Sequence, residues 1–188
     1  IHSIPNPSID TGMGLERIAA VIQGVKSNYE TDLLKTVINR VAELVSLTYG
    51  GDEQNDTSMR VIADHSRAVA FLITDGVFPS NEGRGYVLRR ILRRAVRHAK
   101  MLGVNEPFLH KVLPAVNESL GDAYPELLEK AEFVSKVVRN EEERFLETID
   151  RGLELLEQEI RALKSSSGKK TGTPELSGEV VFKLYDTY

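Results

Sequence analysis

The densest cluster of chemically capable side chains in this sequence is an arginine-rich stretch, residues 84–100, that no acidic residue interrupts. A guanidinium group binds phosphate or carboxylate oxygens through paired hydrogen bonds, in a geometry that the lysine ammonium lacks. The stretch therefore predicts a surface for an anionic partner. The candidate phosphate-binding residues are Arg84, Arg89, Arg90, Arg93, Arg94 and Arg97.

At 100° per residue, a helix over 85–102 places its aliphatic side chains on one face and its arginines on the remaining arc, and Arg84 precedes this helix in the loop. The partner could be nucleic-acid phosphate, a membrane surface or the acidic long helix expected at 125–163. A membrane is not expected, because the apolar face carries neither Trp nor Phe. For any single arginine, an ion pair within the chain remains the alternative. The net charge is −4, so affinity for nucleic acid must come from this local patch.

Asn81 lies in the loop just before the basic helix. Phosphate contacts position a nucleic acid, whereas contacts to base edges specify its sequence. An asparagine amide can both donate to and accept from a base edge, so Asn81 is the candidate for base recognition. The alternative is a turn residue or a helix cap.

A second candidate site is the turn that contains Asp10, Gly12, Gly14 and Arg17. The glycines would let a ligand approach the backbone, and the following helix would point its N-terminal amides at that place. Arg17 could hold a phosphate or stack on a base, and Asp10 could bind an ammonium group. The alternative is an ordinary turn into a helix with a surface arginine.

Helical spacing of apolar residues predicts an all-α fold. The absence of cysteine excludes disulfides, thiol nucleophiles and cysteine-ligated metals, and the histidines show no ligand spacing, so no metal site is expected. His65 is interpreted as a hydrogen-bonded core histidine, and the glutamates at 141–143 as a solvated face. We predict a flexible linker at 164–176. The expected helices are one that ends at Gly24 and others at 33–45, 59–74, 85–102, 107–120 and 125–163, with a last helix capped by Ser177.

Four blocks of the sequence resemble one family. Residues 8–18 resemble the third signature motif of class II aminoacyl-tRNA synthetases in its alanine-specific form. Residues 60–68 and 79–98 are similar to later blocks of alanyl-tRNA synthetases, the second of which contacts tRNA. Residues 184–188 look like the start of a further block. The resemblance covers nearly the whole chain, and both ends look cut, which predicts a fragment of a longer protein.

The resemblance implies a role for each candidate residue. Asp10 would bind the alanine ammonium, and Gly12, Gly14 and Arg17 would belong to the ATP site. Asn81 and Asp186 would read the G·U wobble pair of tRNA(Ala) from its two grooves. The six arginines would bind phosphates of the tRNA acceptor stem.

The resemblance also implies how the chain is organised. Residues 1–24 would end the class II catalytic core, 25–163 would form a helical tRNA-recognition domain, and 177–188 would be a terminal helix that completes it after the linker. The parent would be a cytoplasmic alanine–tRNA ligase that uses ATP and Mg²⁺.

The remaining catalytic motifs and a zinc site would lie outside this chain, so the chain alone is predicted to be inactive and to bind no cofactor. Two alternatives stay open. One is a stand-alone helical RNA-binding or scaffold module, and the other is a separate nucleotide-dependent enzyme that uses the turn at 12–17.

Overall fold

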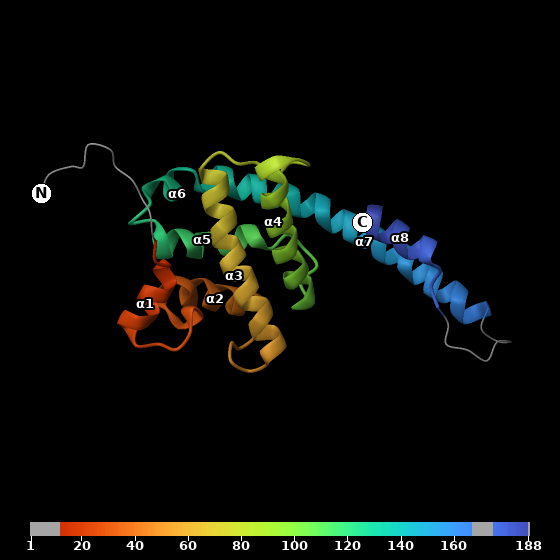
Figure 1. Ribbon diagram of the computed structural model, residues 1–188, viewed down its shortest axis with the longest axis horizontal. Coiled ribbons are helices and arrows are strands. Elements are labelled where there is room, and N and C mark those ends of the chain that lie inside the picture. The colour runs from red at the N-terminus through yellow and green to blue at the C-terminus, as the bar shows by residue number, and fades with distance from the viewer. Residues whose placement is uncertain (1–11, 167–174, 188) are drawn as a thin grey trace, which may run out of the picture.

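The computed structural model describes residues 12–166 and 175–187. Within these ranges the chain forms eight α-helices, one short 3-10 helix and no strand, which confirms the all-α prediction. Helices α1 to α6 and the first part of α7 form the body, and the rest of α7 extends away from it (Figure 1). The elements are α1 (Leu15–Gln23), η1 (Asn28–Glu30), α2 (Asp32–Val45), α3 (Glu53–Thr74), α4 (Gly83–Met101), α5 (Leu109–Leu120), α6 (Pro125–Glu129), α7 (Ala131–Ser166) and α8 (Gly178–Thr187).

The core lies between α2, α3, α4, α5 and the first half of α7. α3 lies at its centre and packs against α2, α4 and α5. Each fully buried aliphatic side chain contributes about 1.5–3 kcal/mol relative to exposure. On α4 most of the aliphatic residues are buried, with Val87 exposed, so the core side of this helix is fixed and its arginines lie on the other faces. The largest fully buried side chains on these helices include Ile38, Met59, Ile62, Leu88, Leu92 and Leu109.

The start of α3 corrects the sequence prediction. We expected this helix to begin at about residue 59, but it begins at Glu53. The side chain of Asp52 caps the helix by accepting the backbone N–H of Asn55 at 2.9 Å. One turn later, Asp56 accepts the backbone N–H of Gly50 at 2.8 Å and ties the preceding loop to the helix. Aspartate at an N-cap satisfies amides that otherwise lack a partner, which explains a helix start among polar residues.

The helix expected at 125–163 is two helices. Pro125 opens α6 as predicted, but the backbone leaves the helical path at Lys130 before α7 begins. The Lys130 ammonium donates to the backbone carbonyl of Thr74 at 2.7 Å, which is the last residue of α3. This contact occupies a carbonyl that the end of α3 leaves without a helical partner. The break between α6 and α7 therefore lies at a residue that is hydrogen-bonded to the end of α3.

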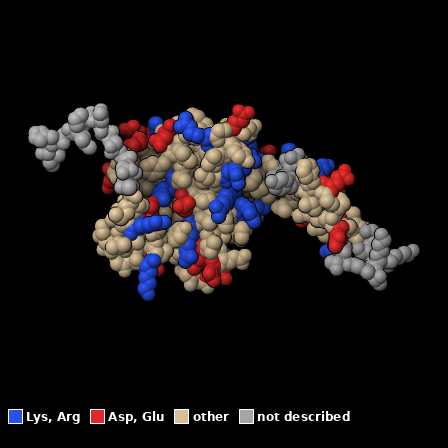
Figure 2. All heavy atoms as spheres, in the orientation of Figure 1, with Lys and Arg blue, Asp and Glu red and all other residues tan. Residues whose placement is uncertain are grey.

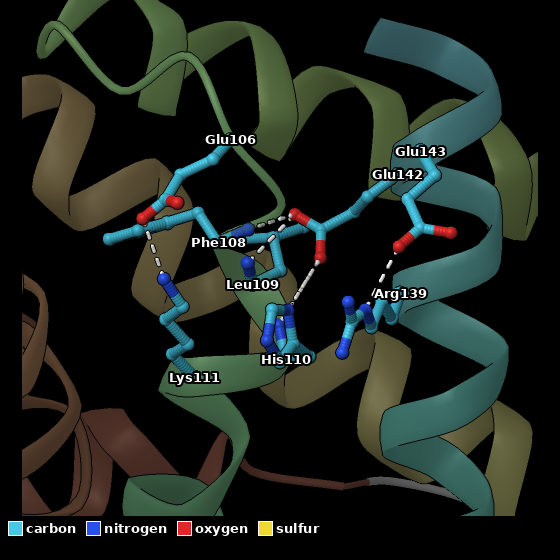
Figure 3. A network of polar contacts seen from close by, with 8 residues as sticks. All are labelled: Glu106, Phe108, Leu109, His110, Lys111, Arg139, Glu142 and Glu143. Atoms are coloured by element: carbon cyan, nitrogen blue, oxygen red, sulfur yellow. Dashed lines mark hydrogen bonds and ion pairs between the residues drawn. The ribbon is translucent and has the colours of Figure 1, made fainter.

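The first residues of α5 are capped by a side chain from α7 (Figure 3). The carboxylate of Glu142 accepts the backbone N–H groups of Phe108, Leu109 and His110 at 2.9, 2.8 and 3.3 Å. Glu142 is fully buried. Burial raises the pKa of its carboxyl group, and the three N–H donors offset part of that rise. The glutamate is thus a structural cap rather than part of a solvated face.

The glutamate run at 141–143 was expected on the surface, and this was wrong for its first two members. Glu141 and Glu142 are buried, and Glu143 alone faces solvent, where it accepts from Arg139 at 2.9 Å. Further along α7, the burial ends. After Leu146, the only buried residue described on this helix is Gly152, which has no side chain. No described helix is long and apolar enough to cross a membrane.

Candidate nucleic-acid interface

The arginine side chains of α4 gather on one face of the molecule (Figure 2). The structure divides the six candidate residues into two groups. Arg89 and Arg93 are partly buried, and Arg84, Arg90, Arg94 and Arg97 are exposed. The division follows from the position of α7, which lies against one side of α4.

The first group is held by a single carboxylate of α7. Arg89 Nε lies 3.1 Å from Oε1 of Glu141. The same oxygen accepts from Arg93, whose Nε and Nη2 lie 3.1 and 3.0 Å away. The Glu141 side chain is 5% exposed, so its carboxylate is shielded from water. The sequence analysis gave an ion pair within the chain as the alternative to phosphate binding. Arg89 and Arg93 form such an ion pair.

The second group has no carboxylate partner. Among the described residues, no ion pair involves Arg84, Arg90, Arg94 or Arg97. The Arg90 guanidinium carbon lies 5.8 Å from the centre of the Tyr86 ring, which is itself half exposed. Arg90, Arg94 and Arg97 lie on one face of α4, and unpaired guanidinium groups placed together repel each other unless an anion lies near them. Arg84 is exposed at the start of the same helix. This face is therefore the strongest candidate for phosphate contact.

A groove of about 540 Å³ runs along this face. Val87, Ile91 and Phe145 form its apolar part, and the Arg93 guanidinium lies 4.8 Å from the centre of the Phe145 ring. Its polar lining is formed by His65, Arg90, Arg93, Arg94 and Arg97.

His65 also lines this groove, which refines its interpretation as a core histidine. It is hydrogen-bonded, as predicted, because its Nδ1 lies 2.9 Å from Oδ2 of Asp64, but its ring reaches the groove surface. The hydrogen bond from His65 lowers the pKa of Asp64. Nearby, burial together with Arg94 and Arg97 lowers the pKa of His98. Burial, Arg94 and Arg97 thus favour the uncharged imidazole of His98.

Asn81 lies exposed in the turn before α4. It does not cap the helix, because the residue at that position is Glu82, whose side chain makes no capping bond. Instead its Oδ1 accepts a hydrogen bond from Nη1 of Arg89. Within the turn, the Ser80 hydroxyl donates to the Glu82 carbonyl at 2.8 Å. The turn is packed directly on Gly85, where an added Cβ would meet the Phe78 carbonyl oxygen at 2.3 Å.

The second candidate site lies at the start of α1, away from the start of α4 (Figure 1). Gly12 and Gly14 are exposed, and the Arg17 side chain folds back over Gly14, 3.7 Å from where a Cβ would stand. Arg17 is exposed and has no ion pair among the described residues. Helix amides and a free guanidinium are donors that can bind a phosphate group. Asp10 lies outside the described residues.

Some contacts could not be found by reading the sequence locally. Glu16 of α1 forms an ion pair with Arg67 of α3, and Arg67 also lies 3.9 Å from Asp64. The burial of Glu142 could have been expected from the sequence, since this residue stands four residues after Val138 and four before Leu146, in the apolar seam of α7.

The backbone of Asp186 belongs to α8, and its side chain is outside the described part of the chain. No group of three or more potential metal ligands occurs in the described ranges.

The family described as tRNA synthetases class II (A) matches residues 1–188. Three curated relatives, each named Alanine–tRNA ligase, match as well. The chain is 51% identical to the protein of Thermoanaerobacter sp. (strain X514) over 187 residues, which are 100% of this chain and 21% of that protein. The protein of Lawsonia intracellularis is 55% identical over 185 residues, 98% of this chain and 20% of its own length. The protein of Caldicellulosiruptor saccharolyticus is 54% identical over 187 residues, which are 100% of this chain and 21% of that protein. The chain thus spans about a fifth of the length of these relatives.

Proposed function

Since the chain belongs to the family of class II tRNA synthetases (A), we propose that it is the part of an alanine–tRNA ligase that binds the acceptor stem of tRNA(Ala) and reads its G·U wobble pair. The parent joins alanine to tRNA in the cytoplasm at the expense of ATP, with Mg²⁺. The observation that carries the proposal is the face of three unpaired arginines, Arg90, Arg94 and Arg97, on the helix that follows the exposed turn of Asn81, with Arg84 exposed at the start of that helix.

The exposed face supplies affinity in this proposal, and the turn supplies specificity. Guanidinium groups bind RNA phosphates whatever the base sequence. Asn81, at the end of this face, would contact the edge of the wobble pair. Asp186 would approach the same pair from the other groove. The helical domain at 25–163 then acts as a clamp on the stem, and 177–188 completes it beyond the linker at 164–176.

The segment at 1–24 would contribute to the ATP and alanine site of the parent. Arg17 and the first amides of α1 would bind ATP phosphate, with Gly12 and Gly14 leaving the space for it. Asp10 would bind the ammonium group of alanine. Mg²⁺ with the bound ATP would neutralise phosphate charge in the transfer, and zinc would be held by another part of the parent.

Acceptor-stem hairpins with G·U or G·C at the third pair test the proposal. We expect the chain to bind both, and to prefer G·U by the roughly 1–3 kcal/mol that one well-placed base contact provides. Fluorescence anisotropy at moderate salt measures both affinities. Equal affinity for the two hairpins would refute wobble-pair recognition by this chain, and no measurable binding would refute the RNA interface itself.

Changing Arg94 to alanine is expected to weaken binding of both hairpins alike. One phosphate contact is lost, so the slope of log K against log salt concentration should become shallower by about 1. The matched control is Arg139→Ala, which removes the same charge from an exposed arginine of α7 that is already paired with Glu143. The control should leave the slope unchanged. Equal slopes for Arg94→Ala and the wild type would contradict the assignment of this face.

A further inference from the structure

Arg89 stands out among the arginines of α4 because its guanidinium contacts two groups of this chain at once. Its Nη1 donates to Oδ1 of Asn81, and its Nε lies 3.1 Å from the buried carboxylate of Glu141 in an ion pair that lacks hydrogen-bond geometry. The side chain is only 20% exposed. A guanidinium committed on both sides is a poor phosphate ligand, which argues against the role that the sequence suggested for Arg89.

The contact with Arg89 decides which end of the Asn81 amide is free. An asparagine side chain has an acceptor oxygen and a donor nitrogen that can exchange places by a 180° rotation. Arg89 offers only donors, so rotation of the amide would replace a hydrogen bond by a contact between two donors. Asn81 therefore keeps its oxygen toward Arg89. Its Nδ2 has no hydrogen bond among the described residues and is left to donate outward.

Arg89 is itself held in place from behind. Glu141 is 5% exposed and is fixed on the other side by Arg93, through contacts of 3.1 and 3.0 Å. A buried carboxylate that is paired with two arginines is costly to move, because separating it from either arginine would leave a buried charge without its opposite charge. Glu141 of α7 therefore holds Arg89 of α4 in place, and Arg89 in turn holds the amide of Asn81 in the turn.

We propose that Arg89 and Glu141 are positioning residues for wobble-pair recognition. They set the amide of Asn81 as a hydrogen-bond donor toward the RNA without touching the RNA themselves. The inference rests on the role proposed above for Asn81 and makes it more specific, because the RNA atom that faces Asn81 must then be an acceptor on the edge of the base pair. An amide already oriented before binding loses less freedom when the RNA arrives.

The experiment compares the affinities of the wild type and of six variants for the G·U and G·C hairpins. Arg89→Lys keeps the charge but lacks the fork that joins Glu141 to Asn81. We expect it to lower the preference for G·U to that of Asn81→Ala, with affinity for the G·C hairpin and the salt slope unchanged. The double variant Asn81→Ala/Arg89→Lys should lose no further preference. Glu141→Gln should lower the preference in the same direction as Arg89→Lys, again with unchanged salt slope.

Different results separate the two proposals. If the wild type shows no preference, or Asn81→Ala retains it, the proposed function of Asn81 fails. If Asn81→Ala loses the preference while Arg89→Lys and Glu141→Gln both retain it, only the positioning role is overturned.

An Arg89→Met variant tests whether Arg89 itself binds phosphate. A salt slope shallower by about 1, as for Arg94→Ala, would show that Arg89 binds phosphate and would also overturn the positioning role. Far-ultraviolet circular dichroism and a thermal melt verify that each variant is folded, and Asn81→Asp, which keeps the Arg89 contact but removes the donor, must lose the preference too.

Discussion

Replacing Glu142 with alanine is expected to lower the free energy of unfolding by about 3 kcal/mol, the largest stability effect that we anticipate for a polar residue of this chain. The reason is geometric. Three backbone N–H groups at the start of α5 use this one carboxylate as their acceptor, and the site is closed to water because Glu142 is fully buried. Urea unfolding followed by circular dichroism at 222 nm measures the change.

The neighbouring glutamate is the matched control. Glu143 is 46% exposed and pairs only with Arg139, one turn away on the same helix. Exposed pairs of this kind contribute about 0.3–0.5 kcal/mol, so Glu143→Ala should unfold nearly as the wild type does. Similar losses for the two variants would contradict the capping role of Glu142.

The charge state of Glu142 adds a pH dependence. Burial raises the pKa of this carboxyl in the folded state above its usual value of 4.5. The folded protein therefore binds the proton more tightly than the unfolded chain does, and the stability gained in this way is fully present below pH 4.5. It is lost as the pH rises through the folded-state pKa. The wild type should accordingly lose stability relative to Glu142→Gln over that interval, whereas a constant difference would contradict the raised pKa.

Gly85→Ala is expected to destabilise the protein by about 1–3 kcal/mol and to reduce wobble-pair preference at the same time. A Cβ at this buried position would lie 2.3 Å from the Phe78 carbonyl oxygen and 2.3 Å from the Ser80 hydroxyl. Neither distance is tolerable, so the turn that carries Asn81 must move away from α4. Thermal unfolding and the hairpin affinities measure the two effects.

Gly178→Ala is the control for this substitution, because nothing lies within 4 Å of an added Cβ at the start of α8. Alanine is also the better helix former by roughly 0.5–1 kcal/mol. This variant should be as stable as the wild type or slightly more so. A Gly85→Ala protein with unchanged melting temperature and unchanged hairpin preference would show that the turn adapts without cost.

The sequence predicted the helices well where apolar periodicity is strong. α2 and α4 lie within two residues of the expected ranges, and Gly24 ends α1 in a left-handed conformation with φ of 68°. The prediction failed where a single polar contact decides the boundary. Asp52 starts α3 six residues early, and the break at Lys130 coincides with a hydrogen bond to a residue 56 positions away. Periodicity carries no information about such contacts.

The candidate interface shows the same contrast. Helical spacing alone was enough to place five of the six arginines opposite an aliphatic face, whereas Arg84 was expected in the preceding loop and lies in the first turn of α4. It could not separate the paired arginines from the free ones, because Glu141 is 48 residues from Arg93 and its burial depends on how α7 packs. Nor could it show that Asn81 contacts Arg89. The functional assignment of each arginine therefore depends on tertiary structure, whereas the existence of the basic face does not.

The burial pattern along α7 has a consequence for local unfolding. Its first half is part of the core, with Val134, Val138 and Leu146 buried, while residues 153–160 are all exposed or only partly buried. Amide hydrogens in a buried turn exchange with solvent only when much of the protein opens, and those in an exposed turn exchange through local fraying. Hydrogen–deuterium exchange should therefore be slow at 134–146 and markedly faster at 153–160. One continuous helix would then belong to two cooperative units, and the boundary between them would lie just beyond the glutamates that hold α4 and α5.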